Sequence, residues 1–287
     1  LMLATGKVSA NSDTTVISSQ EDALAFLEKE RAVKQSQFWP NVKATDFINN
    51  LKENILNPFS LYEGRNTNFC AYAALSYLPL HYDPLGYATF MISIYKNGKA
   101  KMGKVHFFPS YQIRQAAGTL QFKGELDIRP ADQLWFLCLA DHFKGYLNVL
   151  DYHFNMGDEN KLWAAVNYAK FNRMIRRLFN FHIESAGSDI FRPGFYNVYA
   201  YLKKRINGGN LYLYVNNLVL YKKSHTAAKF FLPTHYVLLL DIAEADEMIN
   251  ITYWDYGGRT LQQVTPEFLH NIVFGITHCT KKENKKR

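Results

Sequence analysis

Three residues have the types and the order along the chain that a thiol-nucleophile enzyme needs: Cys70, His235 and Asp255. Cys70 follows the turn-like run 66–69 and begins an apolar, helix-forming run. His235 opens a strand-like run, and Asp255 ends another one. A helix N-terminus and a neighbouring imidazolium both favour a thiolate, and only the thiolate is a good nucleophile. The pattern therefore indicates acyl transfer on a cysteine sulfur.

The segment between His235 and Asp255 predicts a hairpin. Two strand-like runs, 235–240 and 248–254, flank a polar turn at 244–247. Adjacent antiparallel strands of this length place His235 and Asp255 on one face of a sheet. The carboxylate would then bond one ring nitrogen, fix the tautomer and aim the other nitrogen at the thiol.

Each of these residues has competing interpretations. His81 and His106 are the other histidines that could reach a site at Cys70, and Asp241 is an alternative acid. Asp241 lies six residues along the strand from His235, about 20 Å away in an extended chain. The cysteine is otherwise a buried helix thiol, the histidine a strand-edge residue bonded to backbone, and the acid a turn residue before two glycines.

Composition favours a folded domain. The chain has 287 residues, is 48% hydrophobic, and contains 19 tyrosines and 21 phenylalanines, which argues against disorder. It has no apolar run of 18 residues, so no transmembrane segment is expected. The net charge is +8, and part of the surplus lies in the tail 281–287. Zinc-finger spacing and glycine-rich phosphate loops are absent, so a solvated tail is favoured and no nucleic-acid partner is expected.

The cysteines predict neither disulfides nor a metal site. Cys70, Cys138 and Cys279 are an odd number and widely spaced. Cys138 lies in an apolar helical run and is expected to be an inert core thiol, whereas Cys279 is expected to be exposed beside the tail. Two acids and two histidines lie near one another in sequence without the spacing of ligands on one helix face: Asp141, His142, Asp151 and His153. No metal or cofactor is therefore expected.

The chain up to Pro84 is predicted to be mostly helical. Helices are expected over about 20–37 and 44–55, and the nucleophile helix over about 70–77. Pro79 and Pro84 then mark a loop.

Strands and a helical section follow. Residues 88–95 and 104–108 predict strands, with a hairpin signal at Asn97-Gly98. From 130 to about 183 the pattern is helical. The later strand-like runs are 195–199, 211–215, 218–221, 235–240, 248–254 and 272–276, with a short helix near 266–269.

Helices first and a mainly antiparallel sheet last predict an α+β fold. We expect residues 1–17 to be a flexible leader and 281–287 a basic tail. Residues 18–280 are expected to form one domain with a helical insertion at about 130–186.

The order Cys, His, Asp resembles that of the papain-like cysteine peptidase superfamily, in the broad sense that includes bacterial peptidases and toxin domains. Two further features add to this likeness. The cysteine lies at the start of a helix, and toward its end the chain has a strand that carries the histidine, a turn, and a strand that carries the acid. The matching segments are 69–75, 234–238 and 251–258. The resemblance implies a papain-like fold, with Cys70 as nucleophile, His235 as base and Asp255 as the acid that orients the histidine.

The oxyanion-binding group departs from this family's pattern. Its motif Cys-Gly-Ser-Cys-Trp is absent, and the glutamine usually found about six residues before the cysteine is replaced by Gly64. Asn66, Asn68 or the backbone N–H of Cys70 are the candidates for this role.

Aromatic residues near Asp255 are candidate pocket residues. Trp254 would shield the histidine and the acid from water or pack in the core, and Tyr236 follows the histidine directly. Strict alternation places Tyr253 with Asp255 on one face, opposite Trp254 and Tyr256.

These residues predict a cysteine hydrolase, a peptidase or amidase, secreted or delivered as a bacterial effector or toxin. Its substrate would be a peptide or a peptidoglycan-like amide, and an inhibitory immunity protein is a candidate partner. Two alternatives stay open: a non-catalytic binding module on the same fold, and a deamidase or transglutaminase-like acyltransferase.

Overall fold

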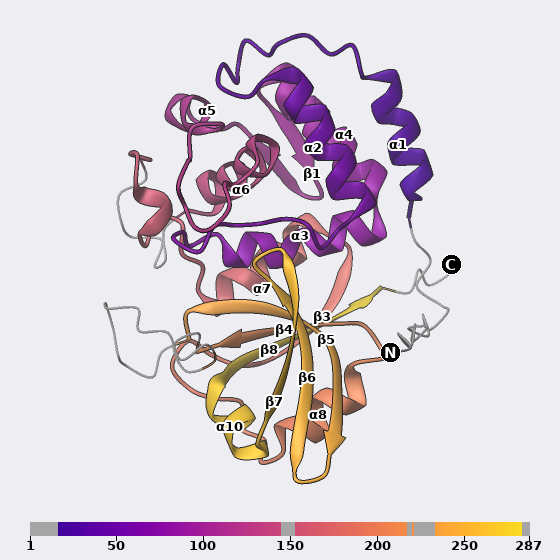
Figure 1. The fold of residues 1–287 in the computed structure, drawn as a ribbon, viewed down its shortest axis with the longest axis vertical. Helices are drawn as coiled ribbons and strands as arrows, with labels where there is room; N and C mark the ends of the chain where they lie inside the picture. The colour runs from indigo at the N-terminus through magenta and orange to yellow at the C-terminus, as the bar shows by residue number, and fades with distance from the viewer. Residues whose placement is uncertain (1–16, 145–152, 217–219, 221–232, 283–287) are drawn as a thin grey trace, which may run out of the picture.

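The order of helices and strands divides the fold into a helical part and a sheet part. A computed structural model describes residues 17–144, 153–216, 220 and 233–282. The helical part comes from the first half of the chain and lies against a twisted antiparallel sheet from the second half (Figure 1). The expected α+β class is confirmed. Across the described ranges, no helix is both long enough and apolar enough to cross a membrane.

The first part is built from helices and one small hairpin. Its helices are α1 (Gln20–Lys29), α2 (Ala44–Leu56), α3 (Cys70–Tyr82), α4 (Pro84–Asn97), α5 (Tyr111–Ala116) and α6 (Pro130–Phe143). The hairpin joins β1 (Ala100–Met102) to β2 (Val105–Phe107). A 3₁₀ turn, η1 (Asp158–Asn160), precedes α7 (Tyr168–Leu178), which lies near α3 between the two parts (Figure 1).

Within the described residues, the second part is a six-stranded sheet together with the helices α8 (Val198–Arg205) and α10 (Pro266–Ile272). Its strands are β3 (Phe181–Gly187), β4 (Asn210–Val215), β5 (His235–Ala245), β6 (Met248–Asp255), β7 (Gly258–Val264) and β8 (Val273–Lys281). The strand order is β3-β8-β4-β5-β6-β7, and every neighbouring pair is antiparallel. The expected pairing of the two strands that carry His235 and Asp255 is therefore present.

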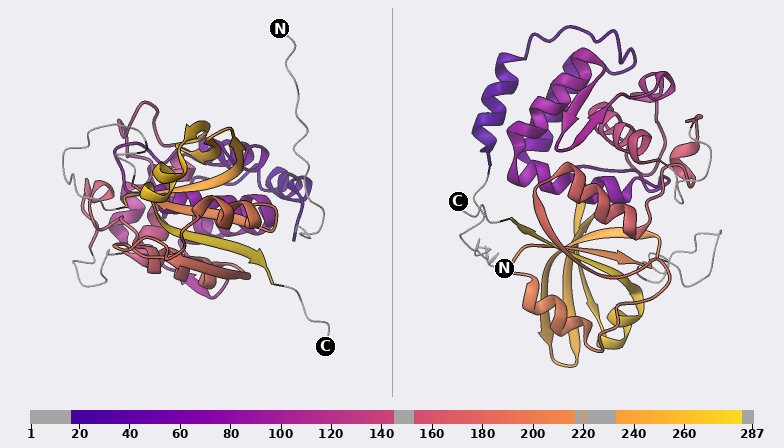
Figure 2. Two further views of the ribbon diagram at one scale, coloured as in Figure 1. Left: turned by 90° about the horizontal axis from the view of Figure 1, so that it is seen from below. Right: turned by 180° about the vertical axis from the view of Figure 1, so that it is seen from behind.

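Alternating side chains of the sheet bury its two faces in two separate cores. Tyr236, Leu238 and Trp254 belong to the core shared with the helical part. Val237 and Tyr253 belong to a second core with α8 and α10, which lie toward the end of the sheet away from α1–α6 (Figures 1 and 2). Because one core covers each face of the sheet, packing on both faces restrains the strands that carry His235 and Asp255.

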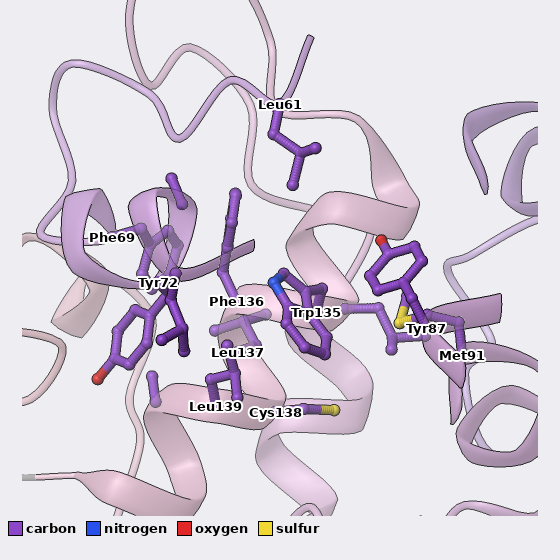
Figure 3. Packing of buried hydrophobic residues seen from close by; sticks show 14 of the residues in the cluster. Leu61, Phe69, Tyr72, Tyr87, Met91, Trp135, Phe136, Leu137, Cys138 and Leu139 are labelled. Carbon is purple, nitrogen blue, oxygen red and sulfur yellow. The ribbon is translucent and has the colours of Figure 1, made fainter. Parts of the chain in front are cut away.

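Helix α3 is fixed by aromatic packing. Its neighbour α6 is buried along nearly its whole length, and Trp135 Nε1 donates to Ser76 Oγ on α3 at 2.7 Å. Phe136 packs on Phe69 with ring centroids 5.5 Å apart (Figure 3). Apolar side chains surround α3 on almost every side, which makes it a rigid support for Cys70 at its first residue.

A buried polar network anchors the loop that precedes α3. Arg129 donates from Nε to Asp132 at 2.8 Å, and Asn54 on α2 donates to the same carboxylate at 2.7 Å. Arg129 also donates to Ser60 O in this loop, at 3.3 Å. The network therefore joins α2 and α6 to the segment that leads to Cys70.

Residues 88–95, expected to be a strand, lie within α4. The reason is local capping: Asp83 Oδ1 accepts the N–H of Gly86 at the start, Pro84 holds the first helical position, and Gly98 ends the helix with φ +65°. The expected hairpin at Asn97-Gly98 is therefore a helix C-cap. A tight hairpin turn and a helix C-cap both need a residue with positive φ, so an Asn-Gly dipeptide is compatible with either one. Pro79, expected in a loop, lies inside α3.

Other boundaries also differ from the expectation. The section expected to be helical to about 183 contains β3 from 181 onward, and its second helix begins only at 168 behind the cap Asn167. Residues 198 and 199, expected to be in a strand, begin α8 behind the cap Asn197. The strand β7 was not expected. Most of the predicted strand 218–221, most of the leader and the end of the tail lie outside the described residues.

Replacing Arg129 by methionine should lower the free energy of unfolding by about 3 kcal/mol or more, because the buried Asp132 carboxylate loses its cation. The control is Arg31→Met, which removes an exposed ion pair to Glu28 and should cost less than about 1 kcal/mol. Urea denaturation at pH 7 measures both values. Equal losses for the two variants would contradict the role of the buried network.

Candidate active site

Cys70 is the first residue of α3. The carbonyl of Phe69 accepts the N–H groups of Tyr72 and Ala73, and the Phe69 ring is fully buried. This apolar anchor fixes where the helix begins. Cys70 itself is partly exposed, and its Sγ lies 3.9 Å from Thr234 O, immediately before β5. The start of the helix therefore places the sulfur beside the start of a strand.

His235 and Asp255 meet at one end of the β5–β6 pair. His235 is the first residue of β5 and Asp255 the last of β6, and Thr234 N donates to Val215 O at 3.0 Å to fix the strand start. His235 Nε2 and Asp255 Oδ2 are 3.2 Å apart, with side chains only 2% and 3% exposed. Such a contact orients the imidazole and determines which ring nitrogen carries the proton.

Burial is the largest influence on the His235 ring and by itself lowers its pKa. Tyr256, Asp255 and Cys70 act in the opposite direction and together exceed the effect of burial. The pKa of His235 is therefore raised well above its ordinary value. His235 and Asp255 are thus in direct contact, and the Cys70 sulfur lies beside Thr234, the residue before His235, although the three residues lie far apart in sequence.

Tyr256 contacts His235, although strict alternation places it on the opposite face from Asp255. Its φ is +45°, so the chain has left the extended conformation of β6 and turns toward Gly257. Its ring stacks on the His235 ring with centroids 4.7 Å apart and an interplanar angle of 14°. Arg65 lies over the same tyrosine ring, 5.6 Å from its centroid.

Both expected pocket aromatics are buried in the core. Tyr236 lies between Phe171 and Tyr214, at centroid distances of 4.4 Å and 4.3 Å. Trp254 is 2% exposed, and its Nε1 donates to Phe59 O at 2.8 Å. Trp254 therefore ties β6 to the loop before α3, and Tyr236 packs the sheet against α7.

The two asparagines proposed for the oxyanion lie in different settings. Asn68 donates from Nδ2 to Lys161 O at 2.9 Å, so its amide already has an acceptor. Asn66 is exposed, and its backbone N–H bonds Lys123 O. Within the described part of the chain, the backbone N–H groups of Cys70 and Ala71 donate no hydrogen bond, as is usual for the first turn of a helix.

The competing residues lie away from this group or are buried. His81 is eleven residues along α3 from Cys70, about 16 Å by helical rise, and burial lowers its pKa. His106 is exposed on β2. Cys138 is buried as expected, but Cys279, expected to be exposed, is fully buried in β8, and burial raises the pKa of both thiols.

Glu63 is a member of the site that the sequence did not single out. Its side chain is buried, Oε1 accepts the N–H of Tyr256 at 3.3 Å, and Oε2 has no hydrogen-bond partner among the described atoms. Burial raises the pKa of Glu63 to about 7, with His235 acting to lower it and Asp255 to raise it. Nothing in its local sequence distinguishes it from a solvated loop glutamate.

A cavity of about 870 Å³ lies at the other end of α3, where Pro79 and Tyr82 line it. It does not include Cys70, so the candidate site is assigned by its chemistry and not by cavity size. Among the residues that the structure describes, no cluster of three or more histidines, cysteines or acids could hold a metal ion.

Comparisons of the chain with protein-family models, with curated proteins and with solved structures give no match. The functional argument therefore rests on the geometry of this site.

Glu63 should make the stability of the protein fall as pH rises from about 4.5 to about 7, because the folded state keeps a proton that the unfolded state releases. The difference between the Glu63 pKa in the folded and unfolded states lowers the free energy of unfolding by up to about 3 kcal/mol above pH 7. Glu63→Gln cannot ionise, so its free energy of unfolding should rise relative to wild type between pH 5 and pH 8. Urea denaturation at both values tests this. The exposed Glu125→Gln is the control, and a similar pH response in the two variants would refute the assignment.

Proposed function

We propose that the protein is a cysteine hydrolase, a peptidase or amidase, with Cys70 as nucleophile, His235 as acid and base, and Asp255 as the orienting acid. One observation carries this proposal. A partly exposed thiol at a helix start lies beside the start of the strand that carries a buried imidazole, and a buried carboxylate holds this imidazole at 3.2 Å. A cysteine that only packs in the fold does not require a paired histidine and carboxylate, His235 and Asp255, beside it.

In the first step, Cys70 transfers its proton to His235, and Sγ attacks the acyl carbon of an amide. The tetrahedral intermediate collapses to a thioester on Cys70, and the C–N bond breaks. His235 gives its proton to the leaving nitrogen, so an amine or ammonia departs. Asp255 stabilises the imidazolium during this step without itself taking the proton.

In the second step, His235 removes a proton from water as the water attacks the thioester carbon. The C–S bond breaks, the acid product leaves, and the proton returns to the thiol. The unbonded N–H groups of Cys70 and Ala71 support a backbone oxyanion site. Exposed Asn66 is the side-chain candidate for a second donor, whereas the Asn68 amide is already engaged.

A papain-like arrangement is supported by the elements that carry the three residues. The cysteine begins a helix packed against the sheet, and the histidine and the acid lie on neighbouring antiparallel strands. We infer that the protein is a papain-like enzyme whose α6 is buried in the same core as α3. As a secreted or delivered bacterial effector, it would act on peptides or peptidoglycan-like amides.

Two other functions predict different reactions. A binding module would keep the fold without a reactive thiol. A deamidase or transglutaminase-like enzyme would share the thioester, but it would release ammonia from side-chain amides without cutting the chain. Ammonia release and peptide cleavage, measured on the same protein substrate, separate the second alternative from a peptidase.

Brief treatment with iodoacetamide at pH 7 should label Cys70 alone, because Cys138 and Cys279 are buried. In His235→Ala the rate at Cys70 should fall roughly tenfold or more, since the thiolate loses its imidazolium partner. Peptide mass spectrometry measures the rate. The control His106→Ala, which changes an exposed histidine on β2, should react as wild type does. Equal rates in wild type and His235→Ala would rule out a catalytic pair.

Asp255→Asn should lower kcat/KM by about 10²- to 10⁴-fold, because an amide cannot stabilise the imidazolium. The control Asp241→Asn changes an exposed acid on β5 and should leave kcat/KM unchanged. Casein, fluorogenic dipeptide amides and peptidoglycan fragments serve as substrates, with Cys70→Ala as the inactive reference. Full activity of Cys70→Ala would defeat the proposal.

A further inference from the structure

Glu63 is surrounded by the residues of the proposed catalytic group. It lies on the loop before α3, while His235 comes from β5 and Tyr256 from the turn after β6. The turn packs closely on this loop, because a Cβ placed at Gly257 would lie 3.3 Å from Leu61 O. The groups that act on this carboxyl are His235, Asp255 and the N–H of Tyr256. Tyr62 and Arg65 are the titratable and charged neighbours on its own loop, and Lys123, which pairs with Glu159, accepts a backbone bond from this loop.

The carboxyl holds the turn that carries two contacts to the imidazole. Glu63 Oε1 accepts the N–H of Tyr256, whose ring stacks on His235, and the preceding residue, Asp255, bonds the same imidazole. Moving this turn would displace both contacts at once. Glu63 therefore positions His235 through these neighbours, and among the described residues it makes no hydrogen bond to the Cys70 sulfur.

The charge of Glu63 and the charge of His235 are coupled. His235 favours the ionised form of Glu63, so by reciprocity an ionised Glu63 favours the protonated form of His235. The two groups are buried, so this coupling is weakly screened by solvent. The second carboxyl oxygen of Glu63, Oε2, has no hydrogen-bond partner among the described atoms.

We propose that Glu63 is a positioning residue that makes the reactivity of this site depend on pH: its carboxyl holds the Asp255–Gly258 turn against His235, and its ionisation strengthens the imidazolium that pairs with the Cys70 thiolate. This proposal rests on the proposed function, because it needs a thiolate–imidazolium pair to regulate. With the pKa of Glu63 near 7, the carboxyl is mostly neutral below that pH and mostly ionised above it. The ionised Glu63 carboxylate is costly to bury, but it favours the protonated form of His235.

The test is a histidine titration by ¹⁵N NMR on wild type, Glu63→Gln and Glu125→Gln. Glutamine keeps the shape and the acceptor for Tyr256 N but cannot ionise. The pKa of His235 should be lower in Glu63→Gln than in wild type, by about one unit, because a buried charge that favours the imidazolium is lost. Glu125→Gln, which changes an exposed acid paired with Arg65 on the same loop, should match wild type. An unchanged His235 titration in Glu63→Gln would overturn the inference.

The alkylation rate of Cys70 separates failure of this inference from failure of the proposed function. If His235→Ala leaves that rate unchanged, the proposed function fails. If the rate depends on His235 but its titration ignores Glu63, only the present inference fails. Should Glu63→Gln not fold, wild type labelled with ¹³C-glutamate provides the test: one buried carboxyl must titrate near pH 7, together with a shift of the His235 resonance. Titration of every glutamate in the ordinary range near 4–5 would overturn the inference.

Discussion

The contact between His235 and Asp255 is the interaction on which the candidate site depends. Two polar side chains at the end of a buried strand pair are costly to desolvate unless they bond each other, and here they lie 3.2 Å apart. Burial alone would lower the pKa of His235, and Tyr256, Asp255 and Cys70 together raise it. Without Asp255 the ring would lose its carboxylate partner and the orientation that this contact gives it.

The rest of the fold brings the sulfur to this pair. The start of α3 is fixed by the buried Phe69 ring, and α3 itself is enclosed by α6 and the sheet. Trp254 bonds the loop before α3, so the strand that carries the acid also restrains the segment that carries Glu63. The same loop is tied to α2 and α6 through Arg129. The start of α3 is thereby held beside the start of β5, which in turn contacts the end of β6 through His235 and Asp255.

The sequence was most informative where chemistry and periodicity agreed. The strand-like runs 235–240 and 248–254 and the turn at 244–247 predicted the β5–β6 pair, and helix α2 was predicted almost to the residue. The prediction of a strand over 88–95 was wrong because the helix caps outweigh the β-branched and apolar composition of this run. These residues lie in α4, which Gly98 ends. Glu63 was missed for a different reason: its burial depends on contacts with a turn about 190 residues away, and local sequence does not encode such a contact.

The most direct test of the account is cross-linking with 1,3-dichloroacetone, whose two carbon–chlorine bonds react with a thiolate and then with an imidazole a few ångströms away. The account predicts a single cross-link, between Cys70 and His235, identified by tandem mass spectrometry in the native protein and absent after unfolding in urea. Cys70 that is alkylated but linked to no histidine, or linked to a histidine other than His235, would contradict the account.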